Sequence, residues 1–300
     1  MDASAIYAAF WRATPRPLGC SNEAWVSRFD RVTMAETTVV PCTTAAENDL
    51  YSMTLGVGAL FWNHTVDPSA PTGAGRLTRT DLVTDVSTQF PDANGSHTVA
   101  VDDQHAFFWD LDLNLLVRSN LDGSGVAPIG PARIDTVLVD DTNVYYFTPV
   151  TCEPNECEDD GTLVALRKDG SPSSTLATGL GVINTAVVHG GFVYWIDRLE
   201  GGSDVRRIPV GGGDVQVLAS GFALISLAVD DTYAYFIDTN GGTERTSGLW
   251  RVPIVGGAKE AIVVSNSVGL AVTVDDTALV WAVEPVSADD PSPGIMMLAK

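Results

Sequence analysis

The stretch Val229-Asp230-Asp231-Thr232-Tyr233-Ala234-Tyr235-Phe236 decides the fold of this chain, because it recurs along the sequence. Residues 101–108, 139–146 and 274–281 align with it without a gap, and each begins with Val-Asp-Asp and ends with an aromatic residue. Self-similarity at a fixed period takes precedence over other signals when a fold is inferred from sequence. The chain is therefore analysed first as a set of repeats.

Three looser copies bring the number of repeats to seven. The equivalent aromatic residues lie at intervals of 38 to 51 residues, with a mean of 45, and are Trp11, Trp62, Phe108, Tyr146, Trp195, Phe236 and Trp281. This is the period of β-propeller blades, each built from four strands. The sequence predicts a single β-propeller of about seven blades, with six or eight blades as alternatives.

Each repeat contains four short apolar runs. In the copy at 224–265 they lie at 224–229, 233–238, 249–254 and 261–264. Runs of this length, rich in β-branched and aromatic residues and bounded by Gly, Asp or Asn, are typical of strands, and no window keeps a helical period. The chain is predicted to be all-β.

We expect one domain over residues 1–300, with repeats at roughly 1–42, 50–90, 97–130, 134–179, 183–220, 224–265 and 269–300. The first repeat begins at its second strand, and the seventh reaches its third strand at 294–298, which gives 26 strands instead of 28. We therefore expect incomplete first and last blades, with either an open seam or further residues upstream.

Acidic residues outnumber basic ones by 38 to 17, so the formal net charge is -21. Such a charge repels nucleic-acid phosphates and anionic membrane surfaces. The longest apolar runs have the length of strands, well short of the roughly 20 residues of a membrane-spanning helix. We expect a monomer that binds no nucleic acid and does not insert into a membrane.

Two segments resemble known propeller families. Strands two and three of one repeat read Val193-Tyr194-Trp195-Ile196-Asp197 and Val205-Arg206-Arg207-Ile208-Pro209, and another repeat contains Asp122-Gly123-Ser124. They resemble the YWTD repeats of lipoprotein-receptor propellers and the Asp-Gly-Ser turns of TolB-like bacterial propellers. The resemblance covers nearly the whole chain and concerns architecture. It implies a platform that binds proteins, peptides or sugars or, less often, an enzyme.

The connections between strands two and three are the long and variable ones, at 63–75, 149–161, 239–248 and 284–294. Recognition usually resides on such loops of a rigid scaffold. The acidic residues of three of these loops are candidate binding residues: Glu153, Glu156, Glu158, Asp159, Asp160, Glu244, Asp289 and Asp290. We expect this acidic loop face to bind a protein, peptide or polysaccharide.

Four carboxylates recur at one turn position of the repeats, namely Asp102, Asp140, Asp230 and Asp275. A ring of carboxylates is one way to hold Ca²⁺. The favoured interpretation is that Asp stabilises turns by accepting backbone hydrogen bonds. A divalent-metal-dependent hydrolase or lyase with an axial site is therefore the alternative function, and no catalytic residue or other cofactor is assigned.

Charged residues also end the second strands and follow in the third. Asp110, Asp197 and Asp238 end second strands, and Arg118, Arg207 and Arg251 lie in the third strands of the same repeats. Opposite charges on neighbouring strands stabilise a sheet when they lie across from one another. We expect one Asp-Arg pair in each of these three blades.

The four cysteines form two plausible pairs. Cys152 and Cys157 lie in one loop, and Cys20 and Cys42 flank a hairpin of the first repeat. Disulfides persist in oxidising compartments, so two bridges predict a secreted, periplasmic or cell-envelope protein, although no signal sequence is evident. The composition, with 14 Arg against 3 Lys and abundant Ala, Gly, Val and Asp, resembles that of a bacterial protein. The leading hypothesis is a non-enzymatic extracytoplasmic binding or scaffold propeller, and a structural module of a larger surface protein is a third possibility.

Overall fold

The computed structural model describes residues 5–12, 23–40, 50–65, 75–130, 134–153, 156–169, 171–239, 247–265, 268–284 and 294–300. Every regular element in these ranges is a β-strand, and all pairs of neighbouring strands whose register is given are antiparallel. None of the described residues forms a helix, so none of them forms a membrane-spanning helix. The prediction of an all-β chain is confirmed.

The chain divides into two compact units, Met1–Val144 and Tyr145–Lys300. In the first unit, blade 1 contains β1 (Ala5–Arg12), β2 (Glu23–Asp30) and β3 (Glu36–Val40). Blades 2 and 3 contain β4 (Leu50–Gly56), β5 (Ala59–Thr65), β6 (Gly75–Asp81), β7 (Ser87–Val101), β8 (His105–Asp110), β9 (Leu115–Asn120) and β10 (Ala127–Pro128). The long strand β7 pairs with β6 in blade 2 and with β8 in blade 3, which joins the two blades into one seven-stranded sheet.

Blade 4 has the order β11-β12-β15-β16, and the boundary between the two units falls inside β12. Its strands are β11 (Thr136–Val139), β12 (Asn143–Phe147), β15 (Gly161–Arg167) and β16 (Ser174–Leu180). The connection from β12 to β15 carries a small separate hairpin, β13 (Cys152–Glu153) and β14 (Glu156–Cys157).

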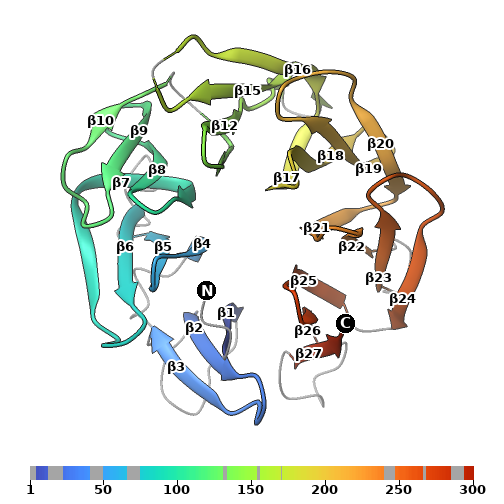
Figure 1. Ribbon diagram of the computed structural model, residues 1–300, viewed down its shortest axis with the longest axis horizontal. Coiled ribbons are helices and arrows are strands. Elements are labelled where there is room, and N and C mark those ends of the chain that lie inside the picture. Colours follow the sequence, from blue (N-terminus) through green and yellow to red (C-terminus); the bar gives the residue numbers. More distant parts are fainter. Residues whose placement is uncertain are drawn as a thin grey trace. The chain divides into compact units, whose positions relative to one another are not determined.

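The second unit continues the same pattern (Figure 1). Blade 5 contains β17 (Val182–His189), β18 (Phe192–Leu199), β19 (Gly202–Pro209) and β20 (Gln216–Gly221). Blade 6 contains β21 (Leu224–Val229), β22 (Tyr233–Thr239), β23 (Ser247–Pro253) and β24 (Glu260–Ser265). Blade 7 contains β25 (Val268–Val274), β26 (Ala278–Glu284) and β27 (Gly294–Ala299).

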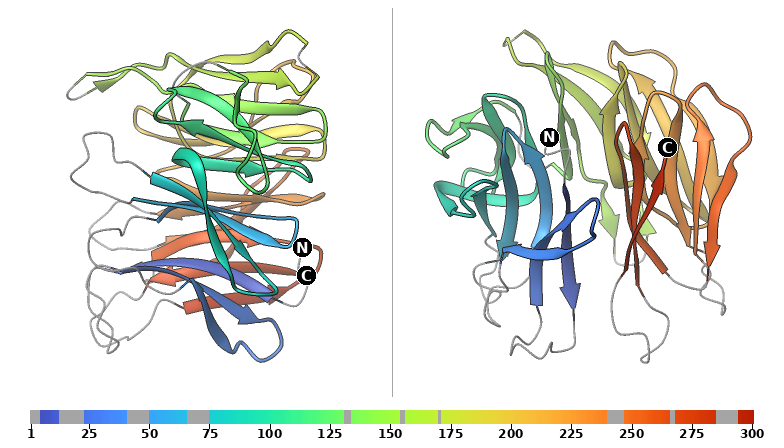
Figure 2. Two further views of the ribbon diagram at one scale, coloured as in Figure 1. Left: turned by 90° about the vertical axis from the view of Figure 1, so that its left-hand side faces the viewer. Right: turned by 60° about the horizontal axis from the view of Figure 1, so that its bottom comes forward.

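The fold is therefore a seven-bladed β-propeller, as the repeats predict. Blades 2 to 6 have four strands, and the first and last blades have three strands each among the described residues. The first strands of successive blades in the second unit are neighbours, because β17 contacts β21 and β21 contacts β25. Figure 2 shows blades 6 and 7 as adjacent sheets whose strands run side by side.

The second strand of a blade is buried on both faces, which explains its continuous apolar sequence. In β22, Phe236 packs with Tyr194 between blades 5 and 6, whereas Tyr235 packs with Leu279 and Trp281 between blades 6 and 7. Alternate residues of one strand thus belong to two different hydrophobic clusters. Burial of a side chain of this size stabilises the fold by about 1.5–3 kcal/mol, so the repeated aromatic residues contribute to the cohesion between blades together with the aliphatic residues of the same clusters.

A buried carboxylate closes blade 5 at the end of its second strand. Asp197 is fully buried, and its two oxygens accept hydrogen bonds from the amide of Gly181 and from the guanidinium of Arg206, each at 2.8 Å. Burial raises the pKa of Asp197, although the neighbouring Arg206 opposes the shift. Residue 181 must be glycine, because a Cβ atom there would lie 3.0 Å from the carboxylate and would collide with the carbonyl of Arg198.

This geometry corrects two of the three predicted Asp-Arg pairs, those of blades 5 and 6, and the pair of Asp110 with Arg118 stays a prediction. Asp197 bonds to Arg206 and not to Arg207, which stacks on the ring of Phe192 at 4.3 Å. In blade 6, Asp238 pairs with Lys259 at 3.3 Å, and Arg251 pairs instead with Glu260 at 2.9 Å. The amides of Phe222 and Ala223 also bond to Asp238, so these carboxylates fasten the start of the first strand to the end of the second.

We expect Asp197→Ala to lower the free energy of unfolding by about 2–4 kcal/mol, because it leaves the buried amide of Gly181 without its acceptor and leaves the guanidinium of Arg206 with Asp204 alone. Asp197→Asn should lose less, since its amide oxygen can still accept one hydrogen bond. Urea unfolding measures both. Asp169→Ala is the control, because that carboxylate lies in an exposed turn and bonds to the amide of Ser171. Equal stability of Asp197→Ala and the wild type would contradict the assignment.

Candidate functional site

The described residues of the acidic loop of blade 4 form a hydrogen-bonded hairpin. At its base, Thr148 and Thr162 exchange hydrogen bonds through backbone and side chains, with the two Oγ1 atoms 3.0 Å apart. Further out, the amide of Glu158 donates to the carbonyl of Thr151 at 2.8 Å, and β13 pairs with β14 beyond that bond. The long connection is therefore a two-stranded projection of the blade.

One of the predicted binding residues holds this hairpin together. Asp160 accepts hydrogen bonds from the amide of Thr151 at 2.8 Å and from its hydroxyl at 2.6 Å. The hydroxyl and the amide of Thr151 together lower the pKa of Asp160, with the hydroxyl contributing most. Asp160 is thus ionised and engaged within the loop, which gives it a role in the shape of the hairpin.

Glu158 and Asp159 are exposed, and no described residue forms an ion pair with either of them. They lie between Asp160 and the paired strands β13 and β14, at the side of the hairpin. The backbones of Glu153 and Glu156 face each other across the hairpin. The structure thus brings Glu153, Glu156, Glu158, Asp159 and Asp160 together in one element, whereas Glu244, Asp289 and Asp290 lie outside the described residues.

The backbone register also brings Cys152 directly opposite Cys157. The bond from Glu158 to Thr151 makes the next pair outward a non-hydrogen-bonded pair, in which Cα atoms are about 4.5 Å apart. This spacing lies within the range of disulfides. A bridge between Cys152 and Cys157 stays a prediction that the backbone supports, and Cys20 and Cys42 lie outside the described residues.

The recurring turn carboxylates are bonded to backbone amides. In blade 6, Asp230 Oδ1 accepts the amides of Thr232 and Tyr233, both at 2.8 Å. Asp102, Asp140 and Asp275 bond in the same way to the amides two and three residues later. Among the described residues, no three His, Cys, Asp or Glu side chains gather as metal ligands do. These bonds are the ones expected if the aspartates stabilise the turns by accepting backbone hydrogen bonds.

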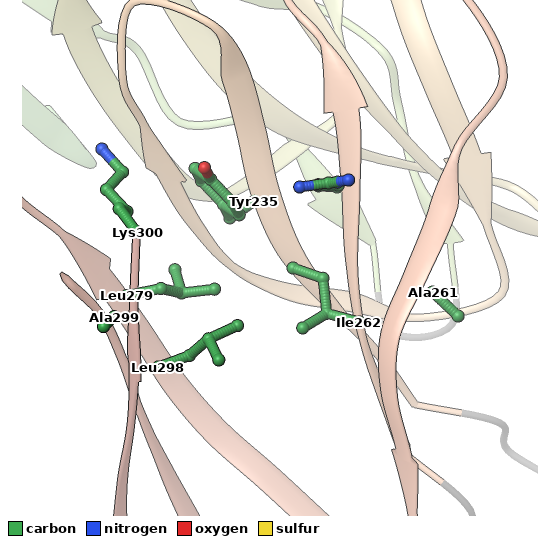
Figure 3. Close-up of a pocket in the computed structure, with 8 residues that line it drawn as sticks. Tyr235, Ala261, Ile262, Leu279, Leu298, Ala299 and Lys300 are labelled. Carbon is green, nitrogen blue, oxygen red and sulfur yellow. The ribbon is translucent and has the colours of Figure 1, made fainter.

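A pocket between blades 6 and 7 is a feature that the sequence did not indicate. It has a volume of about 310 Å³, and its lining residues come from five strands, the last of them β27, and from the residue that follows β27: Tyr235, Arg251, Ala261, Ile262, Leu279, Leu298, Ala299 and Lys300. Figure 3 shows the hydroxyl of Tyr235 and the amine of Lys300 on one side and the side chains of Ile262, Leu279 and Leu298 on the other. The pocket therefore has a polar side and an apolar side.

The polar side is organised by Asp230. Its Oδ2 atom accepts the hydroxyl of Tyr235 at 3.0 Å and lies 2.5 Å from the amine of Lys300. Burial acts to raise the pKa of Asp230, but the hydrogen bonds from Lys300 and from the turn amides outweigh it and lower the pKa. Burial and the bond to Asp230 raise the pKa of Tyr235. This side of the pocket therefore presents the phenol of Tyr235 and the amine of Lys300, which the carboxylate of Asp230 holds from behind the lining.

No protein family model matches the chain, and no curated protein matches its sequence. Solved structures do share the fold. The β-propeller domain of the Trilobed protease from Pyrococcus furiosus aligns with a TM-score of 0.69 at 9% identity, over 99% of this chain and 92% of that chain. A chain of the nidogen/laminin complex aligns with a TM-score of 0.58 at 14% identity, over 83% of this chain and 94% of that one.

TolB from Acinetobacter baumannii aligns with a TM-score of 0.57 at 13% identity, over 86% of this chain and 65% of that chain. The protein also spans 51% of the length of a puromycin-hydrolysing peptidase from Mycobacterium tuberculosis. Identities this low show the fold alone. The resemblance to YWTD and TolB-like propellers is thereby confirmed at the level of architecture.

Peptide mapping under non-reducing conditions should recover residues 152 and 157 in one linked peptide, given the register of β13 and β14. A loop of this length predicts a stabilisation of about 2 kcal/mol for the hairpin in the chain-entropy description. Reduction should therefore increase amide exchange in the hairpin and leave the other blades unchanged. Alkylation of both cysteines in the unreduced, folded protein would contradict the bridge.

Proposed function

We propose that this protein is a non-enzymatic, extracytoplasmic binding propeller whose acidic hairpin on blade 4 recognises a cationic segment of a protein or peptide. The observation that carries the proposal is the order of the hairpin. Hydrogen bonds between Thr151 and Asp160 join its two arms, while Glu158 and Asp159 remain exposed and without an ion pair among the described residues. Carboxylates carried on a hydrogen-bonded backbone are better electrostatic partners than those on a mobile loop, because less backbone entropy is lost on binding.

The charge of the whole chain supports the same class of partner. A net charge of -21 attracts cationic partners from a distance and increases their rate of association. The hairpin adds a local maximum of negative charge on a protruding element. A polysaccharide partner would rely on aromatic or amide groups, which the described part of the hairpin lacks, so the electrostatic argument favours a basic protein or peptide.

Two further observations support the location and the binding role. The facing cysteine positions of the hairpin suit an oxidising compartment. The fold is shared with a chain of the nidogen/laminin complex and with TolB, at identities of 14% and 13%. By analogy of fold alone, the first of these is an assembly of one protein with another, which is the kind of task proposed for this protein.

Binding of a fluorescein-labelled decapeptide of alternating Arg and Ser tests the proposal. We expect the double variant Glu158→Gln/Asp159→Asn to weaken binding about threefold to tenfold at 50 mM salt, because two exposed charges each contribute a modest and screenable attraction. The difference should disappear at 500 mM salt, where the Debye length is only about 4 Å. Fluorescence anisotropy measures both constants.

The matched control is Asp214→Asn/Asp276→Asn, which removes the same charge from exposed short turns of blades 5 and 7. It should leave the affinity within twofold of the wild type. Equal weakening by both double variants would assign the binding to total charge and refute the role of the hairpin. Absence of peptide binding to the wild type at 50 mM salt would refute a cationic partner.

A further inference from the structure

The interface between blades 5 and 6 and the interface between blades 6 and 7 are built from equivalent positions of the repeat. They differ in how completely the side chains at these positions are buried. Val252 pairs with Ala234 in blade 6, and Leu298 pairs with Leu279 in blade 7, so Val252 and Leu298 occupy the same position of the repeat. Val252 is completely buried, whereas Leu298 is 48% exposed and lines the pocket. The same position of the repeat is therefore filled in one interface and open in the next.

The other side of the two interfaces shows the same contrast. Arg207 in blade 5 stacks on Phe192 and bonds to Gln216 at 2.9 Å, and the residue is buried. Arg251 in blade 6 stacks on Tyr233 at the same distance of 4.3 Å and bonds to a glutamate, Glu260. The side chain of Arg251 is 38% exposed and borders the pocket.

A charged residue also replaces an apolar one at the mouth of the pocket. Ile254 follows β23 and packs into the core between blades 5 and 6, whereas the equivalent position after β27 is Lys300. Lys300 is held in place by Asp230 and by the carbonyl of Asp275, which its amine meets at 2.8 Å. The pocket thus combines an apolar wall, a leucine side chain that the described residues leave half-exposed, and an ammonium group held by two acceptors.

The N–H groups of Arg251 and Lys300 that have no acceptor among the described residues indicate which chemical group a ligand would carry. Arginine has five N–H donors, and Arg251 gives one from Nε and one from Nη2 to Glu260. The amine of Lys300 has three, of which two go to Asp230 and to the carbonyl of Asp275. No other described residue accepts from these two side chains, and the hydroxyl of Tyr235 already donates to Asp230. The free capacity at the rim of the pocket therefore consists mainly of charged donors.

We infer that the pocket between blades 6 and 7 binds a small organic carboxylate, with its apolar body against Ile262, Leu279 and Leu298 and its carboxylate against Arg251 and Lys300. A volume of about 310 Å³ accommodates a body of the size of a phenyl or branched aliphatic group. Charge-assisted bonds from arginine and lysine to a carboxylate are among the stronger polar contacts of proteins. This site does not depend on the acidic hairpin, which lies on blade 4.

Phenylacetate, phenylacetamide and phenethylamine test the inference, because they share one apolar body and differ in charge. Saturation-transfer NMR and calorimetry should show phenylacetate binding with a Kd on the order of 1 mM or tighter. Phenylacetamide should bind about tenfold more weakly, since it lacks the charge that the two cations meet. Phenethylamine binding as tightly as phenylacetate would overturn the inference, as would no binding of phenylacetate at 10 mM.

Equivalent positions in neighbouring blades provide a matched pair of variants. Arg251→Gln should weaken phenylacetate binding about tenfold, whereas Arg207→Gln, the same change in the closed interface, should leave it unchanged. Ala261→Trp should fill the pocket and abolish binding, with thermal unfolding confirming that the variant is folded. Equal effects of Arg251→Gln and Arg207→Gln, or undiminished binding by folded Ala261→Trp, would overturn the inference.

Discussion

The structure depends on one constraint, which is that the second strand of a blade is buried on both faces. A strand in this position exposes neither side to water, so each of its side chains must find a partner in the next blade or the previous one. Tyr235 and Phe236 are adjacent in sequence, yet they pack into clusters on opposite sides of blade 6. No blade in this arrangement completes its own core, so each blade depends on its neighbours for stability.

The polar residues of the repeat bond to backbone amides at the ends of strands, which this packing leaves without strand partners. A tight turn between two buried strands has amides without strand partners, and an unpaired amide near the core is costly. Asp230 satisfies two of them, and Asp197 satisfies the amide of Gly181 at the opposite end of a strand pair. Much of the acidity of the chain therefore has a structural origin, and Glu158 and Asp159 stand out because their carboxylates carry no such bond to the described residues.

The fold was predictable because the same local requirements recur seven times in the sequence. Aromatic residues about 45 residues apart, and aspartates at one turn position of four repeats, are enough to place the strands and their order. The partner of Asp197 was not predictable from that level of description. Arg206 and Arg207 are adjacent, and only the register with Asp204 opposite Asp197 shows that Arg206 lies on the same face of the sheet as Asp197. An Asp-Arg pair assigned from strand order alone has no information about this alternation.

The acidic hairpin and the pocket also differ in how far the sequence alone could reveal them. The acidic hairpin is continuous in sequence, so its length and composition are enough to identify it. The pocket brings together residues from β22, β23, β24, β26 and β27, and each of them is ordinary in its own strand. Its signal is a departure from the repeat, in which Lys300 stands where Ile254 stands one blade earlier. In a repeat protein the shared positions specify the scaffold, and specific binding has to arise where one copy differs from its neighbours.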